Sequence, residues 1–457
     1  MNRERLIQTA LGEKKPALVL KNARIINVFT GEILPGDIAV TDGRIAGVGA
    51  YENGEETVDL GGAYVAPGFI DAHVHIESSM VTPPAYCAEA LRWGTTTLIT
   101  DPHEIANVAG GDGVQFMLDL SERLPVNYYV QLPSCVPATP FEHAGDIFTA
   151  EKMSRFLNHP RVLGLGEMMN YPGVAGCDPE VMAKLELYGG RGIDGHAPGI
   201  SKNGLQAYIS AGMATDHEST CWAEAKEKLA AGLAILVREG SAAKNLTAIV
   251  EGLLKEGLPT DRFLFCTDDK HLDDIAREGH IRWNVHQAVQ LGMPVVDAIC
   301  MASYNAARVY GLKGVGAIAP GYRADIVLLD DWKQVHVHAV YKDGVPVEQK
   351  IAAARRVPAP AALTHTMHFA PVTPQQLALP VQGKAHVIEM VPHQIVTRHA
   401  VAPVPSENGL FRPNNTYSKL CVIARHGPAG HISVFPLQGY GTTGRAISPG
   451  QALDSPH

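Results

Sequence analysis

The sequence predicts an α/β fold built around a (β/α)8 barrel of the TIM type, and three observations support this prediction. Between residues 67 and 309, short apolar segments alternate with stretches of helical periodicity, which is typical of a parallel sheet. Eight such segments occur, and eight parallel strands close a barrel of this kind. No Gly-rich phosphate-binding loop follows the first segment, which disfavours the alternative, an open doubly wound sheet.

The segments on both sides of the barrel region predict further units. Residues 17–50 and 314–347 share a texture of short apolar alternations separated by turn signals. Two such pieces around a long middle favour one small β-sandwich, formed by residues 1–66 and 310–359. After a Pro- and Ala-rich linker, weak β patterns in "AHVIEMV" and "KLCVIARHG" predict an incomplete C-terminal α+β domain over residues 360–457.

The composition is that of a globular protein, with 46% hydrophobic and 19% charged residues among 457. The formal net charge of −9 is spread along the chain, which argues against a nucleic-acid partner and against an anionic membrane. The sequence contains neither an N-terminal secretory signal nor an apolar run of about 18 residues that would span a bilayer. The seven cysteines form no CxxC pair, which predicts reduced thiols and a cytoplasmic location.

Residues that commonly bind metals stand at the carboxyl ends of the predicted strands. The first strand ends in "FIDAHVH", and alternation along a strand puts its two histidines on one face. The carboxyl ends of barrel strands meet at one mouth, so residues from different strands converge there. Each residue alone has an ordinary explanation as a surface or capping group, but together they predict a metal site. The six candidates are His73, His75, Glu167, His196, His217 and Asp268.

This set of side chains suits two-metal hydrolysis. Imidazole and carboxylate groups bind divalent ions such as Zn, Fe and Mn. A single glutamate can bridge two ions about 3.5–4 Å apart, and such a pair makes water nucleophilic near neutral pH. We therefore expect Glu167 to bridge the ions and Asp268 to carry a proton from the water to the leaving group.

Three further motifs are expected near the same mouth: "DPHE" after the second strand, the glutamate after the histidine pair, and "REG" after the seventh strand. Their charged residues either orient the ligands and bind substrate or form ion pairs between loops, and the sequence leaves both explanations open. We expect His103 and Glu104 to take part in catalysis, because their loop directly follows a strand end. The candidate substrate-binding residues are Glu77, Asp101, Arg238 and Glu239.

Several long motifs carry a family resemblance. They include "FIDAHVHIESSM", "DPHEIANVAG", "GLGEMMNYPGV", "DGHAPG", "HEST", "REGSAAKNL" and "CTDD". These stretches resemble the bacterial metal-dependent adenine deaminases of the amidohydrolase superfamily. The resemblance implies a (β/α)8 barrel with a β-sandwich, and hydrolysis of adenine to hypoxanthine and ammonia in purine salvage.

The resemblance also implies a cofactor, an assembly and a ligand set. The family uses a paired Fe or Mn centre, with Zn as a further option, and leads us to expect a homodimer. Carried onto matching positions, the ligands are the six residues named above. Many relatives bridge the metals with a carboxylated lysine, whereas this chain has Glu167, as the adenine deaminases do.

The C-terminal end departs from the family pattern. After "GRAIS" the family is expected to continue with a motif close to SHDSHN and about a hundred further residues. This chain instead has "PGQALDSPH", in which we interpret Asp454, Ser455 and His457 as a remnant of that motif. A shortened β unit leaves strand edges and apolar surface exposed, so we expect reduced stability and reduced activity.

Two alternatives to adenine deamination stay open. The ligand set also serves other amidohydrolase reactions, such as opening a cyclic amide or deaminating another heterocycle, and only the loop motifs favour adenine. A second alternative is a shortened protein that binds metal without turnover. The zinc deaminases with H-x-E and P-C-x-x-C motifs are excluded, because the chain contains no CxxC.

Overall fold

The computed structural model describes residues 2–140, 142–352, 357–392, 396–426 and 431–440. Two compact units make up the chain. Unit 1 comprises Met1–His103, Gln115–Ser134 and Thr149–Pro358, and unit 2 comprises Glu104–Val114, Cys135–Phe148 and Ala359–His457. The remnant motif expected at Asp454, Ser455 and His457 lies outside the described residues.

Unit 1 contains the barrel, whose parallel strands form the ladders β10-β9-β8-β7-β6 and β11-β12-β13. Every strand coincides with one of the segments expected from the sequence, so the predicted fold class is confirmed. The strands are β6 (Phe69–Val74), β7 (Thr95–Thr100), β8 (Asn127–Leu132), β9 (Val162–Met168), β10 (Gly192–Gly195), β11 (Thr215–Asp216), β12 (Ala234–Arg238) and β13 (Phe263–Cys266).

Main-chain hydrogen bonds join the two ladders into a closed ring. At one seam the N–H of Asp268 donates to the His73 carbonyl (2.9 Å), and the N–H of His75 donates to the Asp268 carbonyl (3.1 Å). At the other seam the N–H of Ala214 donates to the Ile193 carbonyl (2.9 Å). Closure removes the sheet edges and brings the carboxyl ends of the first and last strands together.

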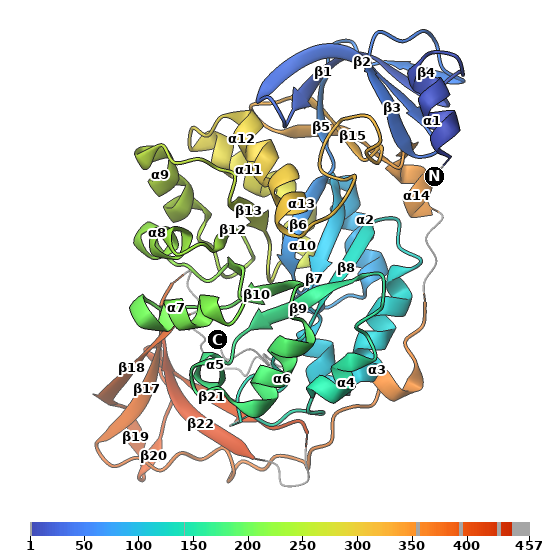
Figure 1. The fold of residues 1–457 in the computed structure, drawn as a ribbon. Helices are drawn as coiled ribbons and strands as arrows, with labels where there is room; N and C mark the ends of the chain where they lie inside the picture. The colour runs from blue at the N-terminus through green and yellow to red at the C-terminus, as the bar shows by residue number, and fades with distance from the viewer. Residues whose placement is uncertain (1, 141, 353–356, 393–395, 427–430, 441–457) are drawn as a thin grey trace. The chain divides into compact units, whose positions relative to one another are not determined.

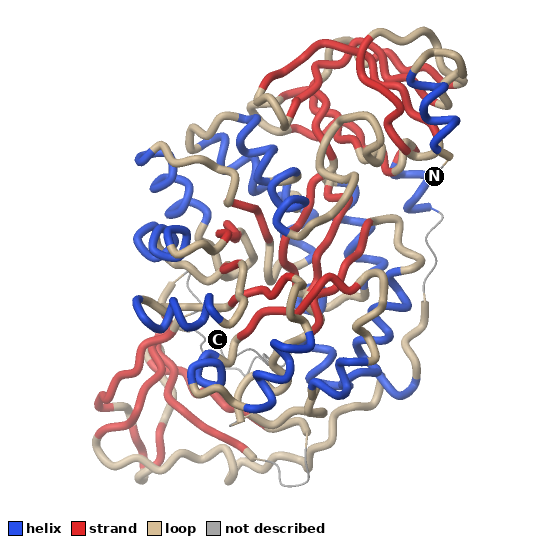
Figure 2. Tube along the Cα trace, viewed as in Figure 1, coloured by secondary structure: helices blue, strands red, loops and turns tan. Residues whose placement is uncertain are grey.

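Helices lie outside the barrel strands of unit 1 (Figures 1 and 2). Helix α9 shows why: its buried residues Leu246, Ile249, Val250 and Leu253 form one apolar stripe, and Gly257 (φ 63°) ends it in the left-handed conformation. The helices between β6 and the end of the barrel region are η1 (Ile76–Ser79), α2 (Pro83–Arg92), α3 (His103–Ser121), α4 (Ala150–Ser154), α5 (Tyr171–Ala175), α6 (Pro179–Leu187), α7 (Lys202–Ser210), α8 (Trp222–Ala230), α9 (Leu246–Glu256), α10 (Leu272–Glu278), α11 (Ile281–Gln290), α12 (Val295–Met301) and α13 (Tyr304–Val309).

The two flanks of the barrel region form one sheet, in the order β16-β15-β14-β5-β1-β2-β3, with β4 paired to β1. Antiparallel pairing of β5 with β14 joins the N-terminal flank to the C-terminal flank. The apolar cluster of this sheet includes Leu20, Ile38, Val65 and Ile326, all buried. Its elements are α1 (Arg3–Ala10), β1 (Leu18–Asn27), β2 (Glu32–Thr41), β3 (Arg44–Gly49), β4 (Glu56–Asp59), β5 (Tyr64–Pro67), β14 (Ile326–Asp331), β15 (His336–Lys342), β16 (Val345–Pro346) and α14 (Val347–Ala352).

Unit 2 contains a sheet in the order β18-β17-β22-β21, and β17 and β21 match the two weak β patterns of the sequence. On one face of the sheet, Val387 of β17 belongs to an apolar cluster with Val381 and Phe411. On the other face Met390, Val401, Val422 and Phe435 are exposed. The elements are η2 (Ala361–Leu363), β17 (Lys384–Met390), β18 (Thr397–Pro403), β19 (Ser406–Glu407), β20 (Leu410–Phe411), β21 (Tyr417–Ile423) and β22 (Ile432–Gln438).

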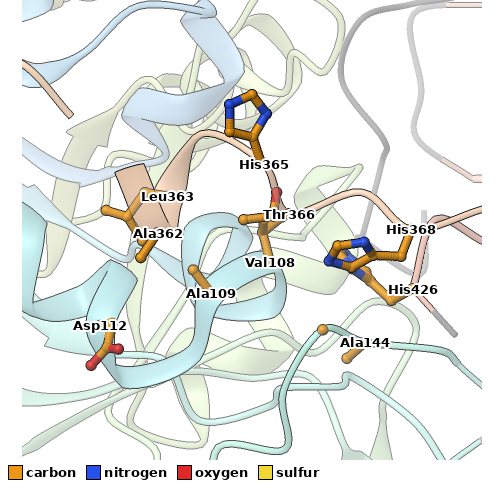
Figure 3. A pocket seen from close by; sticks show the side chains of 11 residues that line it. Val108, Ala109, Asp112, Ala144, Ala362, Leu363, His365, Thr366, His368 and His426 are labelled. Atoms are coloured by element: carbon orange, nitrogen blue, oxygen red, sulfur yellow. The ribbon is translucent and has the colours of Figure 1, made fainter. Parts of the chain in front are cut away.

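A cavity of about 340 Å³ lies within unit 2, between α3, the loop at residues 144–145 and the segment around residues 362–368 (Figure 3). His365, His368 and His426 contribute three imidazoles to its lining. The sequence placed residues 104–114 and 135–148 in the barrel region, whereas the structure groups them with unit 2. Among the described residues, no helix is long and apolar enough to cross a bilayer.

Candidate metal centre

The six predicted ligands are buried, and their polar atoms converge at the carboxyl ends of the barrel strands. The two histidines at the end of β6 bring their Nε2 atoms to 3.0 Å from each other. His75 Nε2 also lies 3.1 Å from Glu167 Oε1 and 3.2 Å from Asp268 Oδ1. The structure therefore brings together residues that are almost 200 positions apart in the sequence.

The two carboxylate oxygens of Glu167 face two separate groups of nitrogens. Oε1 faces the imidazoles of His73 and His75 at 3.9 and 3.1 Å. Oε2 lies 2.6 Å from His196 Nδ1 and 3.1 Å from His217 Nε2. Metal–ligand bonds of about 2.1 Å put neighbouring ligand atoms about 3.0 Å apart in octahedral and about 3.4 Å apart in tetrahedral geometry. The donor set and its spacing thus fit two divalent ions bridged by Glu167.

The hydrogen bond on the far side of His75 sets its tautomer. His75 Nδ1 lies 2.7 Å from the main-chain carbonyl oxygen of Asp101. A carbonyl oxygen only accepts, so Nδ1 carries a hydrogen, and in the neutral ring Nε2 is then the nitrogen whose lone pair is available to a metal ion. This arrangement is typical of metal-binding histidines, whose second nitrogen donates to a carbonyl or carboxylate.

Hydrogen bonds from neighbouring elements hold the other ligands. The Tyr208 hydroxyl accepts from the main-chain N–H of His196 (2.8 Å) and donates to the Met168 carbonyl (2.6 Å). The Asn245 amide donates to the main-chain carbonyl of His217 (3.1 Å). The strand ends are therefore fixed by side chains from α7 and from the loop before α9.

Charge interactions oppose the effect of burial on both carboxylates. Burial alone raises the pKa of Glu167, but the imidazoles of His196, His103 and His217 lower it well below its usual range. Burial likewise raises the pKa of Asp268, and Arg238 and His75 lower it well below its usual range. Both groups are therefore carboxylates near neutral pH, which is the form that binds a metal ion.

Two residues of the "DPHE" motif, Asp101 and His103, lie beside Glu167. Asp101 Oδ2 accepts from the main-chain N–H of Glu167 (2.9 Å), and His103 Nδ1 lies 3.3 Å from Glu167 Oε1. Within the described part of the chain, Asp101 Oδ1 and His103 Nδ1 are buried without a hydrogen-bond partner. This group shares Glu167 Oε1 with the histidine pair, so it belongs to the same centre. Glu104, the next residue, belongs to unit 2.

The other three expected binding residues have different surroundings. Arg238 is 2% exposed and forms ion pairs with Glu218 and with Asp268 Oδ2. Glu239 pairs with Lys244 (3.0 Å), which is the loop-stitching contact that the sequence left open. Glu77 is half-buried in η1, directly after the histidine pair.

Glu218 is a site residue that the sequence analysis did not single out. It is fully buried, and its Oε1 lies 3.2 Å from His217 Nε2. The signal was present in "DHES", where a glutamate directly follows a predicted ligand. In a continuous strand, His217 and Glu218 would point to opposite faces, which would turn Glu218 away from the site. Because β11 ends at Asp216, this alternation does not extend to His217 and Glu218.

Comparisons with known proteins agree with this geometry. The model of the amidohydrolase family matches residues 64–347. The chain is 48% identical over 453 residues to the adenine deaminase of Desulfitobacterium hafniense (strain Y51), covering 99% of this chain and 79% of that protein. It is 45% identical over 460 residues to adenine deaminase 2 of Carboxydothermus hydrogenoformans, covering 98% of this chain and 79% of that protein.

Solved structures show the same fold at lower identity. An enamidase of the amidohydrolase superfamily superposes with a TM-score of 0.55 at 20% identity, over 72% of this chain and 95% of the other. A β-aspartyl dipeptidase from Fervidobacterium islandicum AW-1 gives a TM-score of 0.54 at 16% identity, over 73% and 96%. The structures support the fold, and the sequence relatives narrow the family further. The chain therefore belongs to the amidohydrolase family and, within it, to the adenine deaminases.

Proposed function

We propose that the chain hydrolyses adenine to hypoxanthine and ammonia at a centre of two divalent metal ions. The observation that carries the proposal is the convergence of buried ligand-type side chains on both oxygens of Glu167, in a chain 48% identical to a named adenine deaminase. Both observations are needed, because the set of ligand-type residues serves many hydrolytic reactions and only the similarity to adenine deaminases indicates the substrate.

We assign the metal ligands from the two groups of donor atoms. His73, His75 and Asp268 would hold one ion, His196 and His217 would hold the other, and Glu167 would contribute one oxygen to each. Imidazole and carboxylate donors accept Mn, Fe and Zn, and ligand type alone does not select among them. The resemblance of the motifs to the bacterial adenine deaminases supports Mn or Fe, with Zn as the third option.

The bound ions would supply a water molecule that is deprotonated near neutral pH. Hydrolysis of adenine would form a bond between a water oxygen and C6 of the purine and break the bond from C6 to the amino nitrogen, which leaves as ammonia. Asp268 takes a proton from the attacking water and delivers it to the leaving nitrogen. Arg238 donates to Asp268 Oδ2 (2.6 Å), but each carboxylate oxygen has two lone pairs, so acceptor capacity for that proton remains.

The remaining candidates have supporting roles in this proposal. The buried Nδ1 of His103, 3.3 Å from Glu167 Oε1, supports a catalytic role beside that carboxylate, and Glu104, which follows it in the motif, is proposed to share this role. Glu77 and Asp101 are proposed to contact the purine or to orient the ligands. Glu239 is proposed to shape the loop that it forms with Lys244.

The cellular setting is also a proposal. All seven cysteines are free thiols, as in proteins of a reducing compartment, which supports a cytoplasmic enzyme of purine salvage. The family resemblance supports a homodimer, and light scattering coupled to gel filtration measures the assembly directly.

Ammonia release from adenine tests the proposal, with protein reconstituted in Mn²⁺ or Fe²⁺ and with metal counted per chain. We expect two ions per chain and ammonia from adenine, but none from guanine or cytosine, and no ring opening of dihydroorotate, which releases no ammonia and is followed by chromatography. Turnover of another member of this panel would instead assign a different amidohydrolase substrate. Two bound ions without turnover on the whole panel would identify a metal-binding protein that lacks the activity.

A further inference from the structure

Arg238 links two buried carboxylates, the proposed ligand Asp268 and its neighbour Glu218. It is the last residue of β12 and is 2% exposed. Its Nη1 donates to Glu218 Oε1 and to Asp268 Oδ2, the latter at 2.6 Å. Its Nη2 lies 3.4 Å from the second oxygen of Glu218. One guanidinium at the end of β12 therefore joins the segments that directly follow the neighbouring strands β11 and β13.

The contact with Arg238 determines which way the Asp268 carboxylate faces. Its Oδ1 lies 3.2 Å from His75 Nε2, on the side of the proposed metal position. Its Oδ2 accepts from the guanidinium of Arg238 (2.6 Å). Rotation of the carboxylate would break the bond to Arg238 inside a buried site, where an unmade charged hydrogen bond is costly.

Neighbouring residues hold both the guanidinium and the main chain of Arg238. Glu218 is fully buried and engages both terminal nitrogens of Arg238. The Asn245 side chain accepts from the main-chain N–H of Arg238 (2.8 Å) and donates to the carbonyls of His217 and Ser219 (3.1 and 3.0 Å). Both the backbone and the side chain of Arg238 are thus fixed relative to a proposed metal ligand.

We propose that Arg238, held by Glu218, is a positioning residue that orients the Asp268 carboxylate for proton transfer and does not contact adenine. The inference deepens the proposed function and rests on it. A lysine could supply the charge, but its single nitrogen lacks the planar fork that serves two carboxylates in a fixed geometry. The pair of Glu218 and Arg238 therefore sets geometry as well as charge.

Kinetics of the Mn²⁺-loaded Arg238→Gln and Arg238→Lys variants separate positioning from substrate binding. Misplacing a reacting group by about 1 Å costs ~10²-fold in rate, so we expect kcat to fall by that factor while KM changes less than ~3-fold. The lysine variant keeps the buried charge and therefore folds if the glutamine variant does not. A raised KM with an unchanged kcat would instead show that Arg238 binds the substrate.

A double-mutant cycle identifies the group through which Arg238 acts. In an Asp268→Asn background, Arg238→Gln should lower kcat by less than ~3-fold further, because the carboxylate that it orients is already gone. If the two substitutions together lowered kcat by the product of their separate factors, the proposal would be overturned. Lys342→Met is the matched control, since it also breaks a buried ion pair (to Asp325, 2.9 Å) but lies in the flank sheet. It should leave kcat per folded chain unchanged.

Visible absorption of the Co²⁺-substituted protein provides a readout that does not depend on activity. The ligand-field bands report the geometry around the ion, so Arg238→Gln should shift them as Asp268 reorients, at an unchanged count of two ions per chain. Unchanged bands, or the same shift in Lys342→Met, would contradict a positioning role. If the wild-type protein releases no ammonia from adenine, the proposed function fails, whereas the band shift still decides whether Arg238 orients Asp268.

Discussion

Replacing Glu167 by glutamine tests whether one carboxylate serves both halves of the centre. Glu167 Oε1 lies 3.1 Å from His75 Nε2, and Oε2 lies 2.6 Å from His196 Nδ1 and 3.1 Å from His217 Nε2. Glutamine offers one acceptor oxygen and an NH2 group that only donates. It can bind an ion on one side alone, so Glu167→Gln should retain one metal ion per chain in place of two.

The expected loss of rate follows from the loss of that ion. A catalytic metal stabilises the transition state by several kcal/mol, and about 4 kcal/mol corresponds to ~10³-fold in kcat. The neutral amide also weakens the charge-assisted contacts that the buried Glu167 carboxylate makes with the neighbouring imidazoles, which costs about 1–3 kcal/mol of folding stability. The variant should therefore fold, bind half the metal and turn over ~10³-fold more slowly.

The assay combines elemental analysis after dialysis with ammonia release from adenine. Glu256→Gln is the matched control, because it makes the same chemical change at a surface ion pair with Lys226 (2.6 Å). Exposed ion pairs contribute little to stability, so this control should keep two ions and the wild-type rate. Two ions per chain and a rate within ~3-fold of wild type in Glu167→Gln would refute the bridging role.

Three further predictions address the supports of the site and the fold. Lys342→Met removes the cation beside buried Asp325 and should cost about 3–5 kcal/mol in urea unfolding; an unchanged midpoint contradicts this. Burial raises the pKa of Asp37, but a lysine and two main-chain N–H groups lower it overall. The Asp37 carboxylate therefore stabilises the folded protein above its unfolded-state pKa, and this stabilisation is lost as the pH falls. Asp37→Asn should thus flatten the loss of stability below about pH 4, and an identical acid profile argues against it. Tyr208→Phe leaves the main-chain N–H of His196 without its acceptor, so it should lower the free energy of unfolding by about 1–3 kcal/mol. It should also reduce the amount of metal retained after dialysis, and full retention would show that Tyr208 does not support the site.

The barrel and the convergence of the six candidate ligands were predictable because each rests on a local pattern with a general geometric consequence. Each strand is a short apolar run bounded by turn signals, and strand alternation places His73 and His75 on one face. Barrel closure then makes the carboxyl ends of all strands equivalent, which is why Glu167 and Asp268 could be assigned to one mouth from their positions alone.

What the sequence did not reveal depends on contacts that no local pattern encodes. For Arg238 the sequence predicted substrate binding and left an ion pair open, and the partners of its ion pairs, Glu218 and Asp268, lie 20 and 30 residues away. Choosing between an ion pair and a substrate contact requires the positions of all three strand ends. The same reason explains why residues 104–114 and 135–148 were placed in the barrel region, since their grouping with residues after 359 is set by long-range packing.

Asp268 joins the fold and the chemistry in a single residue. Its main chain has φ 57°, a left-handed conformation that aspartate and asparagine tolerate better than most other side chains. In that conformation its N–H and carbonyl bond to His73 and His75, and these bonds close the barrel at the seam between the last and first strands. The side chain of the same residue faces both histidines and Arg238. Because asparagine keeps the backbone preference and alanine does not, only Asp268→Asn separates the carboxylate from the seam that holds it.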